Sequence, residues 1–202
     1  IVSSHYYHWV QGYDYVKYCN DDRALTKGKK VFFVEEFGYA GANVSLYGDM
    51  IDAAIDNGTS GVLLWSLAHR NRNGGFYWHE GSLGGSVGFC WTYHWPGFLS
   101  GASYNEIETL DLLRERAYEI CGMSVPDMPV PDAPLLLPIS DVRKINWRGS
   151  TGARYYDIER SEGRNGPWTT VGTDVSDAVK NFVALFDDFS ADVGTSYYYR
   201  VI

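Results

Sequence analysis

Residues 30–38 read Lys-Val-Phe-Phe-Val-Glu-Glu-Phe-Gly, and this stretch decides the fold of the first half of the chain. Four consecutive apolar residues without polar alternation are typical of a strand that is buried on both faces of a parallel sheet. The strand ends in Glu35 and Glu36, and catalytic side chains collect at the carboxyl ends of the strands in a barrel of parallel strands. Because successive side chains of a strand point to opposite faces, we expect only one of the two acids to face that end. We single out Glu36 as a nucleophile or general base, with a solvated strand-end acid as the alternative.

The sequence that follows alternates between helix and strand patterns. Apolar spacing predicts a helix over residues 47–57, and residues 61–67 read as a second buried strand. Ser103 and Glu106 form a capping-box pattern that opens a further helix, which ends before Gly122. Alternating strands and helices predict parallel α/β units.

A proline-rich stretch marks a domain boundary. Five of the seven prolines lie between Pro126 and Pro138, and such a stretch behaves as an extended, semi-rigid spacer. Beyond it, short segments of alternating polarity recur about every ten residues, which indicates a β-sandwich of immunoglobulin or fibronectin type. The predicted domains are residues 1–124, a linker over residues 125–133, and residues 134–202.

Composition narrows the class of protein. The 202 residues are 45% hydrophobic and 21% charged, an ordinary globular balance, and no apolar run reaches the ~20 residues of a membrane span. A net charge of −8 without a basic stripe argues against nucleic acid as a partner. Three cysteines provide neither a disulfide scaffold nor a zinc pattern. Because the sequence begins without Met and ends within a strand pattern, we expect an internal piece of a longer, secreted protein.

Aromatic residues are in surplus, with seven Trp and sixteen Tyr. Such side chains suit a flat, partly apolar ligand such as a sugar, although core packing is the alternative. Residues 68–102 form a connection of unusual length that is rich in Gly and aromatic residues, and so long a loop is usually functional. We expect Trp95 and Pro96 to be buried as an anchor, and at least one of Trp78 and Trp91 to be exposed as a ligand contact.

A second cluster, His5-Tyr6-Tyr7-His8, lies upstream of Glu36 at the end of another strand pattern. Histidine and tyrosine can hold a carboxylate in position by donating hydrogen bonds to its charged form. His5 and His8 could instead bind a metal, but no third ligand is suitably spaced, so we expect neither a metal nor another cofactor. Trp65, at the end of the second buried strand, is either a core residue or a platform for a sugar ring.

The order of these motifs resembles the sixth, seventh and eighth strands of a clan A (β/α)8 glycoside hydrolase of family 5. The resemblance rests on His-Tyr-Tyr at residues 5–7, Val-Glu-Glu-Phe-Gly at residues 34–38 and Leu-Leu-Trp-Ser at residues 63–66. Residues 74–79 and 93–98 resemble the long aromatic loop that follows the eighth strand in endo-β-mannanases of that family. The implied fold is the last strands of an incomplete (β/α)8 TIM barrel, followed by a truncated fibronectin type III-like sandwich.

The resemblance also implies roles for individual residues. Glu36 would be the nucleophile of a retaining hydrolase, with His5 and Tyr7 as its supports. The indole of Trp65 would form the base of the subsite that binds the reacting sugar. The peptide bond between Trp65 and Ser66 is often cis in the family. Retaining enzymes need a second carboxylate about 5–5.5 Å away as acid/base. The family carries it on the fourth strand, which these 202 residues do not include.

Two functions therefore stay open. The first is a retaining endo-β-glycanase, a glycosidase that hydrolyses β-mannan or a related β-1,4-polysaccharide if another part of the protein supplies the acid/base. The second is a non-catalytic, hydrolase-derived structural or carbohydrate-binding glycoprotein of an extracellular assembly. Sequons at Asn43 and Asn57 would suit a glycoprotein, but two such motifs decide little.

Overall fold

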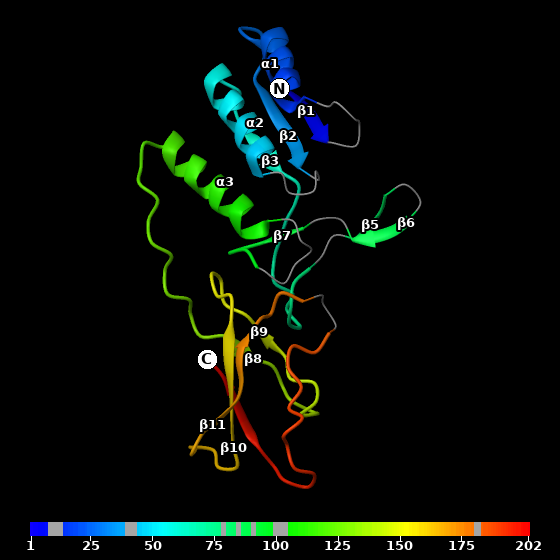
Figure 1. Ribbon diagram of the computed structural model, residues 1–202, viewed down its shortest axis with the longest axis vertical. Helices are drawn as coiled ribbons and strands as arrows, with labels where there is room; N and C mark the ends of the chain where they lie inside the picture. Colours follow the sequence, from blue (N-terminus) through cyan, green and yellow to red (C-terminus); the bar gives the residue numbers. More distant parts are fainter. Residues whose placement is uncertain are drawn as a thin grey trace. The chain divides into compact units, whose positions relative to one another are not determined.

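The computed structural model describes residues 1–7, 14–38, 44–77, 80–83, 86–89, 92–98, 105–179 and 183–202. The chain forms two compact units (Figure 1). The first consists of residues 1–67, 79–93 and 102–126, and the second of residues 68–78, 94–101 and 127–202. The predicted domain boundaries place residues 68–78 and 94–101 in the first domain, whereas these segments belong to the second compact unit.

The first unit contains a parallel sheet covered by helices. Its strands are β1 (Val2–Tyr7), β2 (Phe32–Gly38) and β3 (Val62–Leu64), in the order β1-β2-β3. Helix α1 (Tyr15–Thr26) connects β1 to β2, and α2 (Val44–Asn57) connects β2 to β3 (Figure 1). The predicted α/β character of this half of the chain is therefore confirmed.

The core of this unit lies between the sheet and its helices. The sheet side of the core consists of Tyr6 from β1 and of Phe32, Val34 and Phe37 from β2. The helices contribute Tyr15 and Cys19 from α1, and Tyr47, Met50, Ile51 and Ala54 from α2. The opposite face of the sheet is more open, and Leu63 of β3 is 56% exposed.

Strand β2 contains a β-bulge directly before its carboxyl end. Ser4 of β1 pairs with Val34, but the next residue, His5, pairs with Glu36. The same irregularity appears toward β3, where Val34 and Phe37 pair with residues only two positions apart. One extra residue in β2 explains why Val34 and Phe37, three positions apart, both reach the core.

Helix α3 (Glu106–Ile120) completes the helical part of the first unit. Its N-cap residue is Asn105, so Glu106 occupies the first helical position. A capping box needs its acid at the third position, three residues after the cap. Of the predicted capping box, Ser103 lies outside the described residues, and Glu106 is at the first helical position and not at the third. Beyond α3, residues 123–133 carry no helix or strand and are exposed throughout.

Shorter strands occupy the connection between β3 and α3. They are β4 (Leu67–Ala68), β5 (Glu80–Leu83), β6 (Ser86–Phe89) and β7 (Tyr93–His94). Strands β5 and β6 pair as an antiparallel hairpin.

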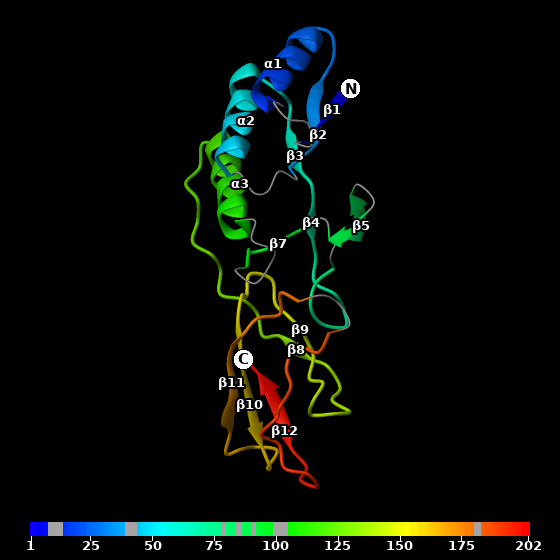
Figure 2. The same cartoon turned by 45° about the vertical axis from the view of Figure 1, so that its right-hand side comes forward.

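The second unit is built around two antiparallel sheets. Strands β8 (Leu135–Leu136) and β9 (Trp147–Arg148) form one sheet. Strands β10 (Tyr156–Ser161), β11 (Thr169–Val175) and β12 (Tyr198–Val201) form the other, in the order β11-β10-β12 (Figure 2). The indole of Trp147 is fully buried beside Tyr156, with ring centroids 5.4 Å apart. The all-β character of this region agrees with its alternating sequence, and its assignment to the fibronectin type stays a prediction.

Two segments of the long connection are integral to this second unit. Phe76 and Phe98 form a buried cluster with Ala178, and the Phe76 amide donates a hydrogen bond to the Val179 carbonyl at 3.0 Å. Pro96 is buried, and its carbonyl accepts a hydrogen bond from Arg154 at 3.2 Å. Phe76 and Phe98 of the loop thus serve as core, because the β-sheet unit supplies apolar neighbours for them, whereas Tyr77 is 38% exposed.

Arg70 makes the strongest polar contacts of these segments. Its Nε donates to Asp177 at 2.8 Å, and its Nη2 donates to the Ala153 carbonyl at 2.7 Å. The Asp177 side chain is fully buried and that of Arg70 is 11% exposed. Burial and the negative charge of Asp177 raise the pKa of the adjacent Tyr156 to about 12. This cluster fastens the start of the long connection to the β-sheet unit.

Candidate active site

The carboxyl ends of β1 and β2 bring His5, Tyr7 and Glu36 together. His5 and Tyr7 are two positions apart and therefore project from the same face of β1. The Tyr7 hydroxyl donates a short hydrogen bond to Glu36 Oε2, and His5 Nδ1 lies 3.3 Å from the same oxygen. The Glu36 side chain is 25% exposed. A partly shielded carboxylate that accepts a hydrogen bond from Tyr7 and has an imidazole nitrogen beside the same oxygen is held in a fixed orientation and stays accessible from solution.

Glu35 belongs to the same cluster. His5 Nε2 lies 3.3 Å from Glu35 Oε2, and the Ser3 hydroxyl donates to that oxygen at 2.7 Å. The hydrogen bonds from Ser3 and then His5 lower the pKa of Glu35 below its ordinary value. The expectation that Glu35 and Glu36 point to opposite sides is wrong, because the bulge in β2 sets both residues against the single partner His5.

Helix α1 fixes β1 from the other side. Ser4 and Tyr6, which alternate with the site residues, both donate to Asp22 Oδ2 at 2.8 Å. Burial, and then the Asp22 carboxylate, raise the pKa of Tyr6 far above its ordinary value. Since Ser4 and Tyr6 are anchored on the helix side, His5 and Tyr7 are directed to the opposite face of the sheet.

Trp65 follows β3 directly and lies at the same end of the sheet. Its amide donates to the Phe37 carbonyl at 2.8 Å, next to Glu36, and its side chain is half-buried. The peptide bond between Trp65 and Ser66 is cis, as the resemblance implied. Gly38 is required here, because its φ is +122° and an added Cβ would lie 3.0 Å from Leu64 Cδ1.

Several predicted residues lie outside the described part of the chain. Trp78 and Trp91, the expected ligand contacts, are among them, as are His8 and the sequon Asn43. Trp95, the expected anchor, is half-buried.

The second sequon, Asn57, is described and its amide is fully engaged. The amide nitrogen donates to Asn20 Oδ1 at 2.9 Å and to Cys19 Sγ at 3.7 Å. The amide oxygen accepts bonds from the Thr59 amide and hydroxyl at 2.9 and 2.7 Å. A glycan on this nitrogen would displace one of its two donor contacts.

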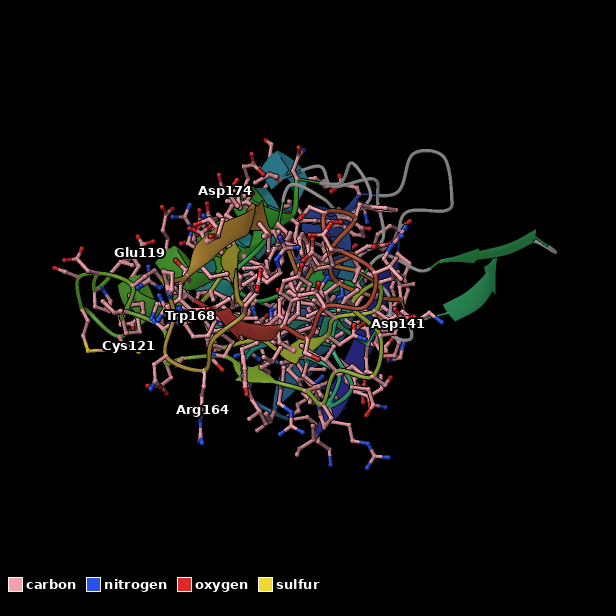
Figure 3. The ribbon with its side chains drawn as sticks, turned by 90° about the horizontal axis from the view of Figure 1, so that it is seen from below. Glu119, Cys121, Asp141, Arg164, Trp168 and Asp174 are labelled. Carbon is pink, nitrogen blue, oxygen red and sulfur yellow. The ribbon has the colours of Figure 1, made fainter. Side chains whose placement is uncertain are left out.

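The described residues contain no cluster of metal ligands, and two of the cysteines are free thiols. Within residues 1–7, 14–38 and the other described ranges, no three His, Cys, Asp or Glu side chains are grouped to hold a metal ion. Cys19 is a buried free thiol and Cys121 an exposed one (Figure 3). None of the described helices combines the length and apolarity that a bilayer crossing requires.

Three aromatic rings of the second unit are stacked against its own arginines. The guanidinium carbons lie 3.8–4.6 Å from ring centroids in three pairs: Arg143 on Phe189, Arg160 on Tyr197 and Arg200 on Trp168. Ring faces already stacked on cations are not free platforms for a sugar. These three rings are therefore not candidate sugar contacts. The candidate site is the cluster around Glu36, on which Tyr7 and His5 converge.

Sequence reasoning missed Ser3 and Glu35 as members of this cluster. The available signal was the spacing of the apolar residues Phe32, Val34 and Phe37. Phe32 and Val34 are two positions apart, as strand alternation requires, but Val34 and Phe37 are three positions apart. This spacing indicates one extra residue at Glu35 and Glu36.

Comparisons with known proteins give one remote likeness. No family model matches the sequence, and no curated protein matches it. Among solved structures, the endo-beta-1,4-mannanase from Thermotoga petrophila is similar, with 18% sequence identity and a TM-score of 0.40. The likeness covers 79% of this chain and 36% of that one, so the chain spans about a third of its length.

Proposed function

We propose that this chain carries the nucleophile part of the active site of a retaining endo-β-glycanase that hydrolyses a β-mannan or a related β-1,4-polysaccharide. The observation that supports it is the convergence of the Tyr7 hydroxyl and His5 Nδ1 on Glu36 Oε2. The hydrogen bond from Tyr7 favours the ionised carboxylate, and the two neighbours of Oε2 fix the plane of the group. In this proposal the other oxygen, Oε1, is the attacking atom.

The chemistry then runs in two steps. Glu36 Oε1 attacks the anomeric carbon as the glycosidic C–O bond breaks, and a second carboxylic acid protonates the departing oxygen. Water, deprotonated by that second group, then hydrolyses the glycosyl–Glu36 ester with net retention. We assign the second group to a part of the protein outside these 202 residues.

The architecture supports the proposal that the first unit is part of a (β/α)8 barrel. All-parallel sheets occur almost only where both faces are covered. Helices cover one face of the β1-β2-β3 sheet, whereas the face that carries His5 and Leu63 is open. Further strands closing over that face would form the cleft for Glu36. The second unit would be a fibronectin type III-like spacer, and a polymeric substrate would place the protein outside the cell.

The test is covalent trapping in the full-length protein with 2-deoxy-2-fluoro-β-mannosyl fluoride. Attack by Glu36 expels fluoride without a protonated acid, and the fluorine at C2 slows hydrolysis of the ester. We expect one added fluoromannosyl group, located by peptide mass spectrometry on Glu36. Glu36→Gln should take up no label and should lose at least ~10³-fold of the turnover of manno-oligosaccharides. The exposed α3 residue Glu115 provides the matched control, and Glu115→Gln should be labelled like the wild type.

Two results would count against this function. Labelling of a residue other than Glu36, or full turnover by Glu36→Gln, would remove Glu36 from the role of nucleophile. Binding of manno-oligosaccharides by a wild-type protein that is neither labelled nor active would favour the non-catalytic carbohydrate-binding alternative.

A further inference from the structure

The His5 imidazole lies between two carboxylates. Its Nδ1 is 3.3 Å from Glu36 Oε2 and its Nε2 is 3.3 Å from Glu35 Oε2. A neutral imidazole has one N–H and an ionised carboxylate only accepts hydrogen bonds. A neutral ring would therefore satisfy one of the two acids and turn a lone pair toward the other.

Glu35 is held in the acceptor form by its own partners. The Ser3 hydroxyl donates to the same Oε2 that faces His5. This bond and the one from His5 lower the pKa of Glu35, so its carboxylate is ionised at neutral pH. Side-chain exposure of 49% lets solvent reduce, but not abolish, its field on the ring.

The bulge in β2 makes this arrangement specific. Counted from Val34, which packs on the helix face, regular alternation would leave Glu35 on the face of Ser3 and His5 and would carry Glu36 to the helix face. The extra residue keeps Glu36 on the face of His5 as well. The bulge thus places both the nucleophile and a second negative charge beside the same imidazole.

We propose that Glu35 is a positioning residue for the nucleophile, acting through His5: it keeps a second proton on the imidazole, so that Nδ1–H is directed at Glu36 Oε2. This inference rests on the proposed role of Glu36. The donor to Glu36 is then charged, and charge-assisted hydrogen bonds are the stronger kind. Among the described residues, the titratable groups that face the His5 ring are Glu35 and Glu36 from β2 and Tyr7 from β1.

The experiment is an ¹⁵N NMR titration of the histidine ring nitrogens in the full-length protein, which needs no turnover. Glu35→Gln keeps the size of the side chain and removes its charge. Removal of an opposite charge lets the ring lose its second proton at lower pH, and we expect the His5 midpoint to fall by about 0.5–1 pH unit. Ser3→Ala should shift it in the same direction by less, and Glu115→Gln should not shift it. An unchanged midpoint in Glu35→Gln would overturn the inference.

Trapping kinetics complete the test. In Glu35→Gln we expect labelling of Glu36 to slow on the order of tenfold near neutral pH and to recover toward low pH, where the ring is doubly protonated without help. A merely structural role would slow labelling equally at every pH, and that outcome would overturn the inference. Failure of the proposed function would appear as absence of label in the wild type, whereas failure of this inference appears only in the variants.

Discussion

Removal of the Asp177 carboxylate should destabilise the second unit more than any surface charge change. Asp177→Ala leaves the Arg70 guanidinium, only 11% exposed, without its carboxylate. Loss of one partner from a buried ion pair costs about 3–5 kcal/mol, because the other charge stays desolvated. Arg70 would keep its bond to the Ala153 carbonyl, so we expect about 3 kcal/mol, the lower end of that range.

Native-state hydrogen exchange of the β10 amides around Ile158 would measure this loss in the second unit alone. Asp187→Ala is the matched control, because Asp187 pairs with Arg143 on the surface and such pairs contribute about 0–1 kcal/mol. The double variant Arg70→Met/Asp177→Ala should be less destabilised than Asp177→Ala, since no buried charge is left unpaired. A cost below ~1 kcal/mol for Asp177→Ala, equal to that of the control, would refute this reasoning.

Three further outcomes are expected. Gly38→Ala should destabilise the first unit by about 1–3 kcal/mol in urea unfolding, because of its positive φ and the contact with Leu64, and an unchanged midpoint would contradict this. Burial raises the pKa of Asp188, but hydrogen bonds from Ser190, Tyr199 and Arg160 outweigh it and hold the pKa below its ordinary value. The stability that Asp188→Asn loses at pH 7 should therefore begin to shrink as the pH falls below about 4 and should vanish once the pH is below the lowered pKa of the folded state, and a pH-independent difference would argue against it. Trp78→Ala or Trp91→Ala should weaken manno-oligosaccharide binding by ~1 kcal/mol in calorimetry with little change in Tm, and loss of stability without loss of affinity would make the loop a structural element.

The sequence predicted those strands and helices that have a clear apolar pattern of their own. The apolar run before Glu35 predicted β2, and the helical spacing of Met50, Ile51 and Ala54 predicted α2. Helix α1 was not predicted, because it buries only Tyr15 and Cys19 and shows almost no apolar stripe. Its one clear signal was Asp14, an N-cap that accepts a hydrogen bond from the Lys17 amide.

The residues of the candidate site likewise include some that the sequence predicted and some that it did not. Glu36, His5 and Tyr7 could be predicted because each ends a recognisable strand, and parallel strands bring their carboxyl ends together. Glu35 was missed, because the prediction assumed strict alternation, which holds only for a strand without a bulge. The contact of Arg70 with Asp177 spans 107 positions in sequence, and no local pattern encodes a pairing at that distance.

Because residues 68–78 and 94–101 belong to the second unit, cleavage of the chain between the two units has a particular consequence. A protease acting on the exposed stretch 123–133 would sever the backbone before β8, yet the Arg70–Asp177 ion pair and the packing of Phe76 and Phe98 on Ala178 would hold the nicked halves together. Conversely, a recombinant module that starts at the prolines would expose Asp177 and Ala178 to water. A domain boundary placed at that stretch would therefore separate the second unit from part of its own core.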